Sequence, residues 1–386
     1  MKRIAAAVIF FLALWPLAAS AFDTSARAAF VIDQTTGTVL LSKNADTPLP
    51  PASMSKLMTL YVAFEAVRDG RLSLDEQLPV SEHAMSYGGS TMFLDTTDRV
   101  RVEDLLRGII VLSGNDACAV IAEALSPDGT EAGFARMMTQ RAQQLGMTNT
   151  TLMNSNGWPQ AGHLMSVRDL ALLARHLIED FPEFYPLFAE TEFNFDGRAP
   201  KNNTNRNPLL SLGIGVDGLK TGHTQDAGYG LVGSARQDDR RVIFVISGLD
   251  SMKQRAEESE AIVNWAFRQF AQRPLAKAGE TIAEADVWLG AEARVNLVPA
   301  NDLDILMPVL QKGPVEAEVV FTAPVAAPIA KGDRLGELVF TPEGMPEMRL
   351  PLVADRDIPR GGFVSRVSTA ALVLFERLRQ GSEVAM

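Results

Sequence analysis

Two kinds of hydrophobic periodicity follow one another along this chain, and their order restricts the possible folds more than any other feature of the sequence. Residues 28–42 hold two apolar runs around a Gln-Thr-Thr-Gly turn, which predicts a β-hairpin. Strand patterns return only at residues 218–248, after a long stretch with helical spacing. Strands at both ends with helices between them predict an α+β domain over residues 22–272, whose sheet joins its two ends. The helical stretches are residues 53–67, 102–110, 116–125, 167–178 and 258–270, and the late strands are residues 218–223, 229–235 and 241–248.

The pattern changes again at Pro274, where helical periodicity ends. Short alternating runs follow at residues 315–321, 335–340 and 348–353, separated by Pro and Gly. A chain of 386 residues is also too long for one ordinary core. We therefore expect a second, small all-β domain over residues 273–360, and nothing in it suggests chemistry.

The first 21 residues have the pattern of a secretory signal. Lys2 and Arg3 precede an apolar stretch over residues 4–17, and Ala-Ser-Ala at residues 19–21 fits a cleavage site. The alternative is a retained membrane anchor, but the apolar stretch is short and ends in small residues. We expect cleavage after Ala21 and a mature chain that works outside the cytoplasm.

Residues 363–380 form a different kind of segment at the other end of the chain. Their apolar residues recur at i, i+3, i+4 spacing and would share one helical face. Arg366 and Arg377 make a membrane-spanning helix costly, so the helix would either lie in a membrane interface or dock on the protein itself. The pattern alone leaves both possibilities open.

Charge and composition exclude several functions. The formal net charge is −11, and removal of Lys2 and Arg3 takes it to −13, with no basic tract for nucleic acid. Cys118 is the only cysteine, so no intrachain disulfide can form, and we expect it to be a small buried hydrophobic residue. The four histidines form no metal-binding pair such as H-E-x-x-H, so neither a metal nor another cofactor is expected.

The first chemical motif is S-x-x-K at Ser53 and Lys56. Ser53 follows Pro-Pro-Ala and precedes a helical pattern, so we expect it at a helix N-terminus, with Lys56 one turn away on the same face. A serine hydroxyl needs an adjacent base to be a nucleophile, and a lysine is that base only if burial or a second cation lowers its pKa. Two alternatives are a simple N-cap role for Ser53 and Ser55 as the nucleophile, although Ser55 would point away from Lys56.

Two further motifs follow in order, S-G-N at residues 113–115 and K-T-G at residues 220–222. The Ser113 hydroxyl and the Asn115 amide can relay a proton and hold a substrate amide, although Asn115 and Asp116 could simply cap a helix. Lys220 is expected on a strand, where a second cation would lower the pKa of Lys56. Thr221 would alternate to the other face, and Gly222 would leave room for a ligand strand.

These motifs and their surroundings resemble the low-molecular-mass penicillin-binding proteins, in particular the periplasmic serine-type D-Ala-D-Ala carboxypeptidases. The matching segments are PASMSKLMT at 51–59, GGSTMF at 88–93, SGNDA at 113–117, GLKTGHT at 218–224, AGY at 227–229 and RAEESE at 255–260. The resemblance covers the whole mature chain. It implies a β-lactamase-like domain with a helical subdomain on an antiparallel sheet over residues 22–272, an all-β domain over 273–360, and an amphipathic membrane-surface helix over 361–386. It also implies a location in the periplasm, attached to the outer face of the inner membrane.

The resemblance further implies roles for individual residues. Ser53 would attack the carbonyl between the two terminal D-alanines of a peptidoglycan stem peptide, with Lys56 as general base. Ser113 would relay protons with Lys220, and Asn115 would hold the substrate amide. Water would then release the acyl-enzyme, whereas β-lactams would remain attached to Ser53.

The remaining implied roles concern substrate binding. The backbone N–H groups of Ser53 and His223 would form an oxyanion hole, and Thr221, Thr224 and Arg255 would bind the terminal carboxylate next to Gly222. Arg255 could equally be a solvated residue at a helix start. His163 lies in a stretch that resembles the family's loop near the site, and we favour a structural role for it.

Three other functions compete with this interpretation. Residues 190–194 resemble the loop that carries the deacylating Glu of class A β-lactamases, here Glu190. However, Phe193 and Phe195 alternate with polar residues before Asp-Gly, which indicates a strand and a turn instead. A D,D-endopeptidase would use the same motifs, and a non-catalytic cell-wall binding protein would not need them.

Overall fold

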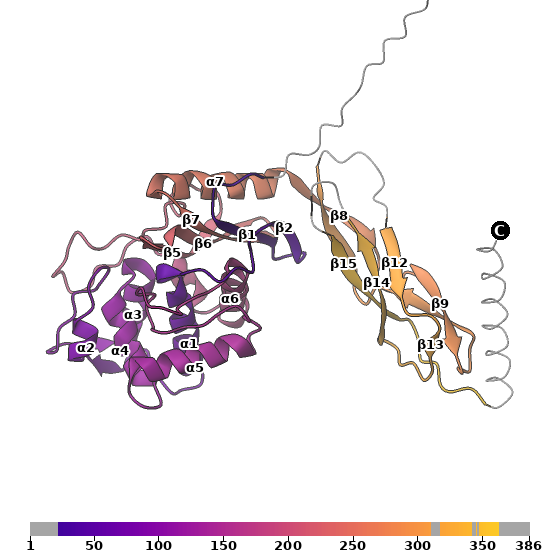
Figure 1. Ribbon diagram of the computed structural model, residues 1–386, viewed down its shortest axis with the longest axis horizontal. Coiled ribbons are helices and arrows are strands. Elements are labelled where there is room, and N and C mark those ends of the chain that lie inside the picture. The colour runs from indigo at the N-terminus through magenta and orange to yellow at the C-terminus, as the bar shows by residue number, and fades with distance from the viewer. Residues whose placement is uncertain (1–21, 310–316, 342–344, 346, 363–386) are drawn as a thin grey trace, which may run out of the picture.

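The computed structural model describes residues 22–309, 317–341, 345 and 347–362. It has two bodies, joined where helix α7 (Met252–Arg268) leads into strand β8 (Phe270–Ala276) (Figure 1). The predicted signal at residues 1–21 and the predicted tail helix from residue 363 onward lie outside the described residues. Within the described part of the chain, no helix is long and apolar enough to cross a membrane.

A five-stranded antiparallel sheet forms the centre of the first body, in the order β2-β1-β7-β6-β5. Its strands are β1 (Ala28–Asp33), β2 (Thr38–Lys43), β5 (Val216–Thr224), β6 (Gly228–Gln237) and β7 (Arg240–Leu249). In β1, Ala28 pairs with Ser247 and Asp33 with Val242, so the first hairpin is bonded to the last strand. The predicted sheet that joins both ends of this domain is confirmed, and β5 is left as an edge strand.

The two faces of this sheet have separate cores, because side chains alternate along each strand. Ile243 and Val245 of β7 pack with the helical side of the domain, which includes α6 (Val167–Asp180). Phe244 and Ile246 point the other way and pack with α7. Figure 1 shows α7 on one side of the sheet and α6, with the remaining helices, on the other.

Helix α1 (Lys56–Arg68) is the centre of the helical subdomain, and ten of its 13 residues are buried. A helix that is apolar around most of its circumference must be enclosed by other elements, and α4, α5 and α6 all contact it. The other elements here are α2 (Glu82–Met85), α3 (Val102–Arg107), α4 (Asn115–Leu125), α5 (Glu131–Gln144), the 3₁₀ helices η1 (Ala52–Ser55) and η3 (Tyr185–Ala189), the π-helical turn η2 (Gly108–Leu112), and the strands β3 (Gln77–Pro79) and β4 (Arg99–Arg101).

Several of these elements differ from the sequence predictions. Helix α5 was not predicted, because its only large buried apolar side chains are Phe134 and Met138, too few for a clear periodicity. Helix α7 begins at Met252, six residues before its predicted start, where the Ser251 side chain caps it by accepting from Gln254 N. The strand predicted near Phe193 is only an isolated bridge, although the turn that follows it is present.

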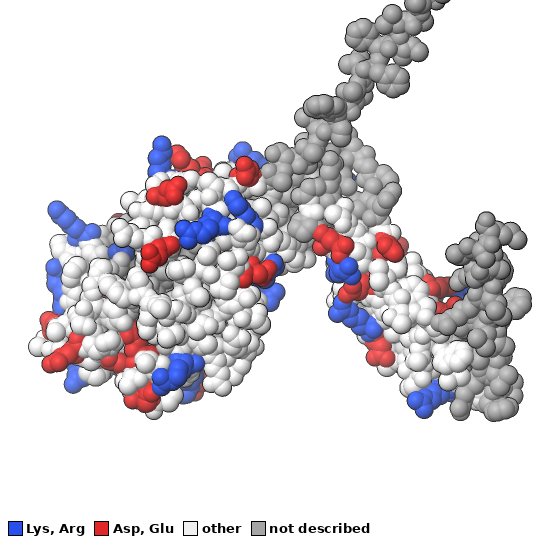
Figure 2. All heavy atoms as spheres, viewed as in Figure 1, with Lys and Arg blue, Asp and Glu red and all other residues white. Residues whose placement is uncertain are grey.

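The second body is all-β, as predicted, and has its own core. Six strands form one sheet in the order β12-β14-β15-β10-β9-β13, and β11 pairs with β8. Their bounds are β9 (Ala283–Trp288), β10 (Arg294–Val298), β11 (Leu303–Pro308), β12 (Ala317–Phe321), β13 (Val325–Ala326), β14 (Arg334–Phe340) and β15 (Met348–Ala354). Figure 2 shows acidic and basic side chains interspersed over the visible face of both bodies.

Candidate active site

Three segments that are distant in the sequence meet at the β5 edge of the main sheet. They are η1 with Ser53, the turn between η2 and α4 with Ser113, and β5 itself with Lys220. A cavity of about 380 Å³ lies where they meet. Six of the predicted site residues line it: Ser53, Ser113, Thr221, Gly222, His223 and Arg255.

Lys56 lies directly behind Ser53 and is completely buried. Its Nζ is 2.9 Å from Ser53 Oγ, 2.7 Å from Asn115 Oδ1 and 2.5 Å from the carbonyl oxygen of Asn156. Burial lowers the pKa of Lys56 to about 8, since a desolvated ammonium is unfavourable. At pH 7 roughly a tenth of the lysine is therefore a neutral amine that can accept the Ser53 proton.

The turn that carries Ser53 differs in detail from the prediction. Ser53 lies inside the 3₁₀ helix η1, and Ser55 occupies the N-cap position of α1 without a capping bond from its side chain. The N-cap role proposed for Ser53 is therefore wrong. Ser55 is buried and its hydroxyl donates to Ala52 O at 3.0 Å, so it does not compete as nucleophile.

Two glycines allow this turn to pack closely against its neighbours. A Cβ on Gly222 of β5 would lie 3.0 Å from Met54 Cγ and from Pro51 O. The turn therefore occupies the space beside Gly222, whereas the sequence analysis expected a ligand strand there. Gly157 has φ +81°, and a Cβ there would lie 1.9 Å from Ala52 O. Both glycines therefore help to fix the position of the turn that carries Ser53.

Ser113 and Lys220 form the second polar pair. Their Oγ and Nζ atoms are 2.9 Å apart and both residues are buried. Ser113 has left-handed backbone angles (φ 61°, ψ 35°) directly after the π-helical turn η2, an irregularity that directs its side chain at the site. Burial, followed by the charges of Lys56 and Arg206, lowers the pKa of Lys220 well below its usual value.

Asn115 is the first residue of α4 and connects both sides of the site. Its Oδ1 accepts from Lys56, and its Nδ2 donates to Gly88 O at 2.8 Å, which leaves one N–H for a substrate amide. Asp116, the other half of the predicted cap, accepts from Met92 N at 2.9 Å and holds residues 88–94 against α4.

Two arginines give one end of the cavity a positive charge. Arg255 is only 5% exposed and lies in the first turn of α7, so the solvated alternative for it is wrong. Arg206, which the sequence analysis missed, also lines the cavity and contacts Ser90 Oγ. Among the described residues no acidic side chain pairs with either guanidinium, an arrangement that suits a ligand carboxylate. An arginine in an Asn-rich segment carries no signal of this role in the sequence.

His223 and Thr224, the two predicted site residues that follow K-T-G, line different cavities. His223 is exposed and its ring stacks on Tyr229 with centroids 3.8 Å apart. Thr224 lines a neighbouring cavity, and its Oγ1 accepts from Ala227 N at 3.1 Å in the turn to β6. The Thr224 hydroxyl can still donate its hydrogen, so the expected contact of Thr224 with the carboxylate stays a prediction.

Three other residues discussed in the sequence analysis, Glu190, Cys118 and His163, do not line the cavity beside Ser53. The Glu190 carboxylate accepts from Arg107 Nε and Nη2, both at 2.9 Å, and does not line the cavity. Cys118 is a free, fully buried residue, as expected. His163 is buried, its Nδ1 accepts from Met153 N at 3.0 Å, and burial lowers its pKa to about 4, in keeping with a structural role. No three His, Cys, Asp or Glu residues in the described part of the chain are grouped to hold a metal.

Comparisons with known proteins agree with this geometry. A family model described as D-alanyl-D-alanine carboxypeptidase matches residues 16–251, and one described as penicillin-binding protein 5, C-terminal domain, matches residues 270–360. D-alanyl-D-alanine carboxypeptidase DacC of Escherichia coli is 36% identical over 98% of this chain and 96% of the relative. Penicillin-binding protein 5 from Haemophilus influenzae has a TM-score of 0.74 and 33% identity, covering 88% of this chain and 99% of that chain. Penicillin-binding protein D2 from Listeria monocytogenes, in its ampicillin-bound form, has a TM-score of 0.57 and 32% identity, covering 64% and 98%.

Proposed function

The chain belongs to the family of D-alanyl-D-alanine carboxypeptidases, and from this premise we propose that Ser53 is the nucleophile that removes the terminal D-alanine from peptidoglycan stem peptides. The activity is that of a serine-type D-Ala-D-Ala carboxypeptidase. The observation that carries the assignment of Ser53 is the 2.9 Å contact between its Oγ and a buried lysine whose pKa is lowered.

In the proposed acylation, neutral Lys56 takes the proton of Ser53 while Oγ attacks the carbonyl carbon of the penultimate D-alanine. The backbone N–H groups of Ser53 and His223 stabilise the oxyanion. Ser113, 2.9 Å from Lys220, donates its proton to the leaving amine as the C–N bond breaks, and the proton held by Lys56 replaces it, so that Lys56 is neutral again. Lys56 then takes a proton from the water that attacks the ester and returns it to Ser53 as the acyl C–O bond breaks.

The edge strand β5 and the two arginines orient the substrate in this proposal. An extended peptide can pair with the outer edge of β5, where no described strand lies, as in strand addition. Its terminal carboxylate is bound by Thr221, Arg255 and Arg206, which all line the same cavity. The carboxylate thus sets the register that brings the scissile carbonyl to Ser53.

β-Lactams are proposed to acylate the same serine, and the ampicillin-bound Listeria relative supports this. Incubation with benzylpenicillin should add one molecule to the intact protein, with the adduct on the peptide that contains Ser53. The matched Ser53→Ala variant should show no adduct and no release of D-alanine. An adduct on a different peptide would overturn the assignment.

Substitution of Arg255 tests the proposed carboxylate contact. Arg255→Gln is expected to lower kcat/KM for a peptide ending in D-Ala-D-Ala about 10- to 100-fold, since a charge-assisted hydrogen bond is lost. A C-terminally amidated peptide should be equally poor for both enzymes. Arg268→Gln on the exposed end of the same helix is the control. If Arg255→Gln preferred the free acid over the amidated peptide as strongly as the wild type does, Arg255 would not be a residue that binds the substrate carboxylate.

We also propose that the enzyme works in the periplasm, attached to the outer face of the inner membrane by the amphipathic segment near residues 363–380. A chain that ends after Arg360 should leave the membrane fraction and keep its acylation rate, because each domain has its own core. Full-length protein fractionated in parallel is the control. Retention of the shortened chain on membranes would refute the anchor.

A further inference from the structure

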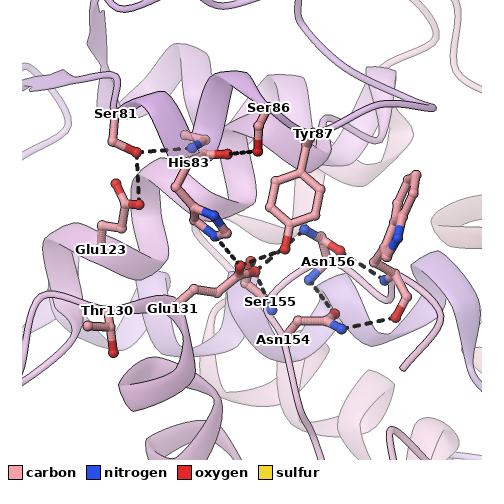
Figure 3. A network of polar contacts seen from close by, with 12 residues as sticks. Ser81, His83, Ser86, Tyr87, Glu123, Thr130, Glu131, Asn154, Ser155 and Asn156 are labelled. Atoms are coloured by element: carbon pink, nitrogen blue, oxygen red, sulfur yellow. Dashed lines mark hydrogen bonds and ion pairs between the residues drawn. The ribbon is translucent and has the colours of Figure 1, made fainter. Parts of the chain in front are cut away.

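A buried acidic residue outside the three motifs is the centre of a polar network beside the active site (Figure 3). Glu131 in the first turn of α5 is 7% exposed. Its carboxylate accepts from Ser155 N at 2.9 Å, Ser155 Oγ at 2.5 Å, Tyr87 Oη at 2.6 Å and His83 Nε2 at 2.7 Å. Burial opposes ionisation, but the bonds from Ser155, Tyr87 and His83 prevail and lower the pKa of Glu131, which is therefore charged.

The segment bound by Glu131 is also bound by the catalytic helix α1. Ser155 O accepts from Thr59 Oγ1 at 2.5 Å, and Asn156 O accepts from Lys56 Nζ at 2.5 Å. Lys56 and Thr59 are three residues apart, so they lie on the same face of α1. Ser155 thus contacts Glu131 through its N–H and α1 through its carbonyl, and the next carbonyl reaches the general base.

The Asn156 carbonyl determines how the Lys56 amine is oriented. A neutral amine has two N–H donors and one lone pair. Two of the three groups around Nζ, Asn115 Oδ1 and Asn156 O, only accept hydrogen bonds, and they use both donors. The lone pair is then directed at the third group, the Ser53 hydroxyl at 2.9 Å. If Asn156 O moved, the amine could rotate and donate to Ser53 instead.

We propose that Glu131 is a positioning residue of the general base: through Ser155 it holds the Asn156 carbonyl that directs the Lys56 lone pair at Ser53. The proposal rests on the catalytic roles of Ser53 and Lys56 given above. Glu131 also adds a negative charge near Lys56, which favours the ammonium form. In the described part of the chain its only ion-pair partner is His83, whose side chain is half exposed.

The alternative is that Glu131 only stabilises the N-terminus of α5, as acidic residues commonly do. Glu131→Gln distinguishes the positioning role from the purely structural role. A glutamine amide has only one acceptor oxygen, and its NH₂ group would face donors that then have no acceptor. The control is Glu123→Gln, the same change in a nearby carboxylate of α4 that accepts from Ser81 and does not touch Ser155 (Figure 3).

The measurement is the rate of acylation by benzylpenicillin against pH, divided by the active fraction from titration of Ser53. Glu131→Gln should slow acylation about 10- to 100-fold per active site, while KM for a D-Ala-D-Ala peptide stays near that of the wild type because Glu131 does not line the cavity. Loss of the anion should also move the acid limb to lower pH. The other groups facing Lys56 remain in place: Asp116 and Cys118 of α4, Lys220 of β5, and Arg206.

A second variant keeps the test valid if Glu131→Gln folds poorly. Thr59→Val removes the other bond to the same segment with little change in shape, and should slow acylation about 3- to 10-fold. Normal rates per active site in both variants, with an unmoved acid limb, would refute the proposal. So would a loss fully explained by a smaller active fraction. Failure of the wild-type protein to be acylated at Ser53 would instead refute the proposed function.

Discussion

Lys56→Ala is expected to slow acylation of Ser53 by benzylpenicillin about 10³-fold or more, as for other catalytic groups that act as a unit. The alanine removes the base 2.9 Å from Ser53 Oγ, and no other described group in the site makes that contact. Stopped-flow measurement of adduct formation gives the rate. Lys253→Ala, at a largely exposed lysine of α7, is the matched control and should react normally. A near-normal rate in Lys56→Ala would exclude this lysine as the base.

The pH dependence of the wild-type enzyme gives an independent check. The pKa of Lys56 is lowered to about 8, and the amine accepts a proton only in its neutral form. Acylation should therefore rise with pH, and the midpoint of this rise should lie at about pH 8. An acid limb centred near pH 10 would mean that burial does not activate this lysine.

Gly157→Ala is expected to cause the largest loss of stability. The new Cβ would lie 1.9 Å from Ala52 O, and φ +81° is unfavourable for alanine. Overlap with backbone cannot be relieved by rotating a side chain, so we expect a loss of about 3–4 kcal/mol. Because Ala52 precedes the nucleophile, the active fraction should fall as well. Thermal unfolding and penicillin titration measure the two effects.

Gly162→Ala is the control for this prediction. Gly162 lies in the same loop and has nearly the same backbone angle, φ +84°, but a Cβ there would meet only Met153 side-chain atoms at 3.8 Å or more. It should cost about 1–2 kcal/mol, the strain of the left-handed conformation alone. Equal losses in the two variants would show that the contact with Ala52 is unimportant.

Much of the fold followed from local patterns in the sequence. The five strands of the main sheet and helix α6 have clear apolar periodicity, because one side of each is buried. Helix α5, which packs against α1 and α4, lacks that signal because only two of its large apolar side chains, Phe134 and Met138, are buried. Residues near Phe193 had an alternating pattern but no continuous partner strand, and so formed only a bridge.

The site followed from the sequence to the extent that its residues lie in motifs. Ser53, Lys56, Ser113 and Lys220 were named from spacing and resemblance, and the structure brings them within hydrogen-bond distance in pairs. Arg206 was missed because it stands in an irregular segment with no pattern. Thr224 lies at the end of β5 and lines a neighbouring cavity, so its expected contact with the carboxylate stays a prediction.

The sequence by itself predicts the proposed nucleophile, Ser53, and its proposed base, Lys56, because S-x-x-K places both groups within one helical turn. It does not determine the protonation state of Lys56 or the direction of its lone pair. They depend on burial and on the Asn156 carbonyl, which comes from a loop 100 residues away and is itself held by Glu131. Desolvation and hydrogen-bond direction are properties of surrounding atoms, so they come into existence only when distant segments pack together.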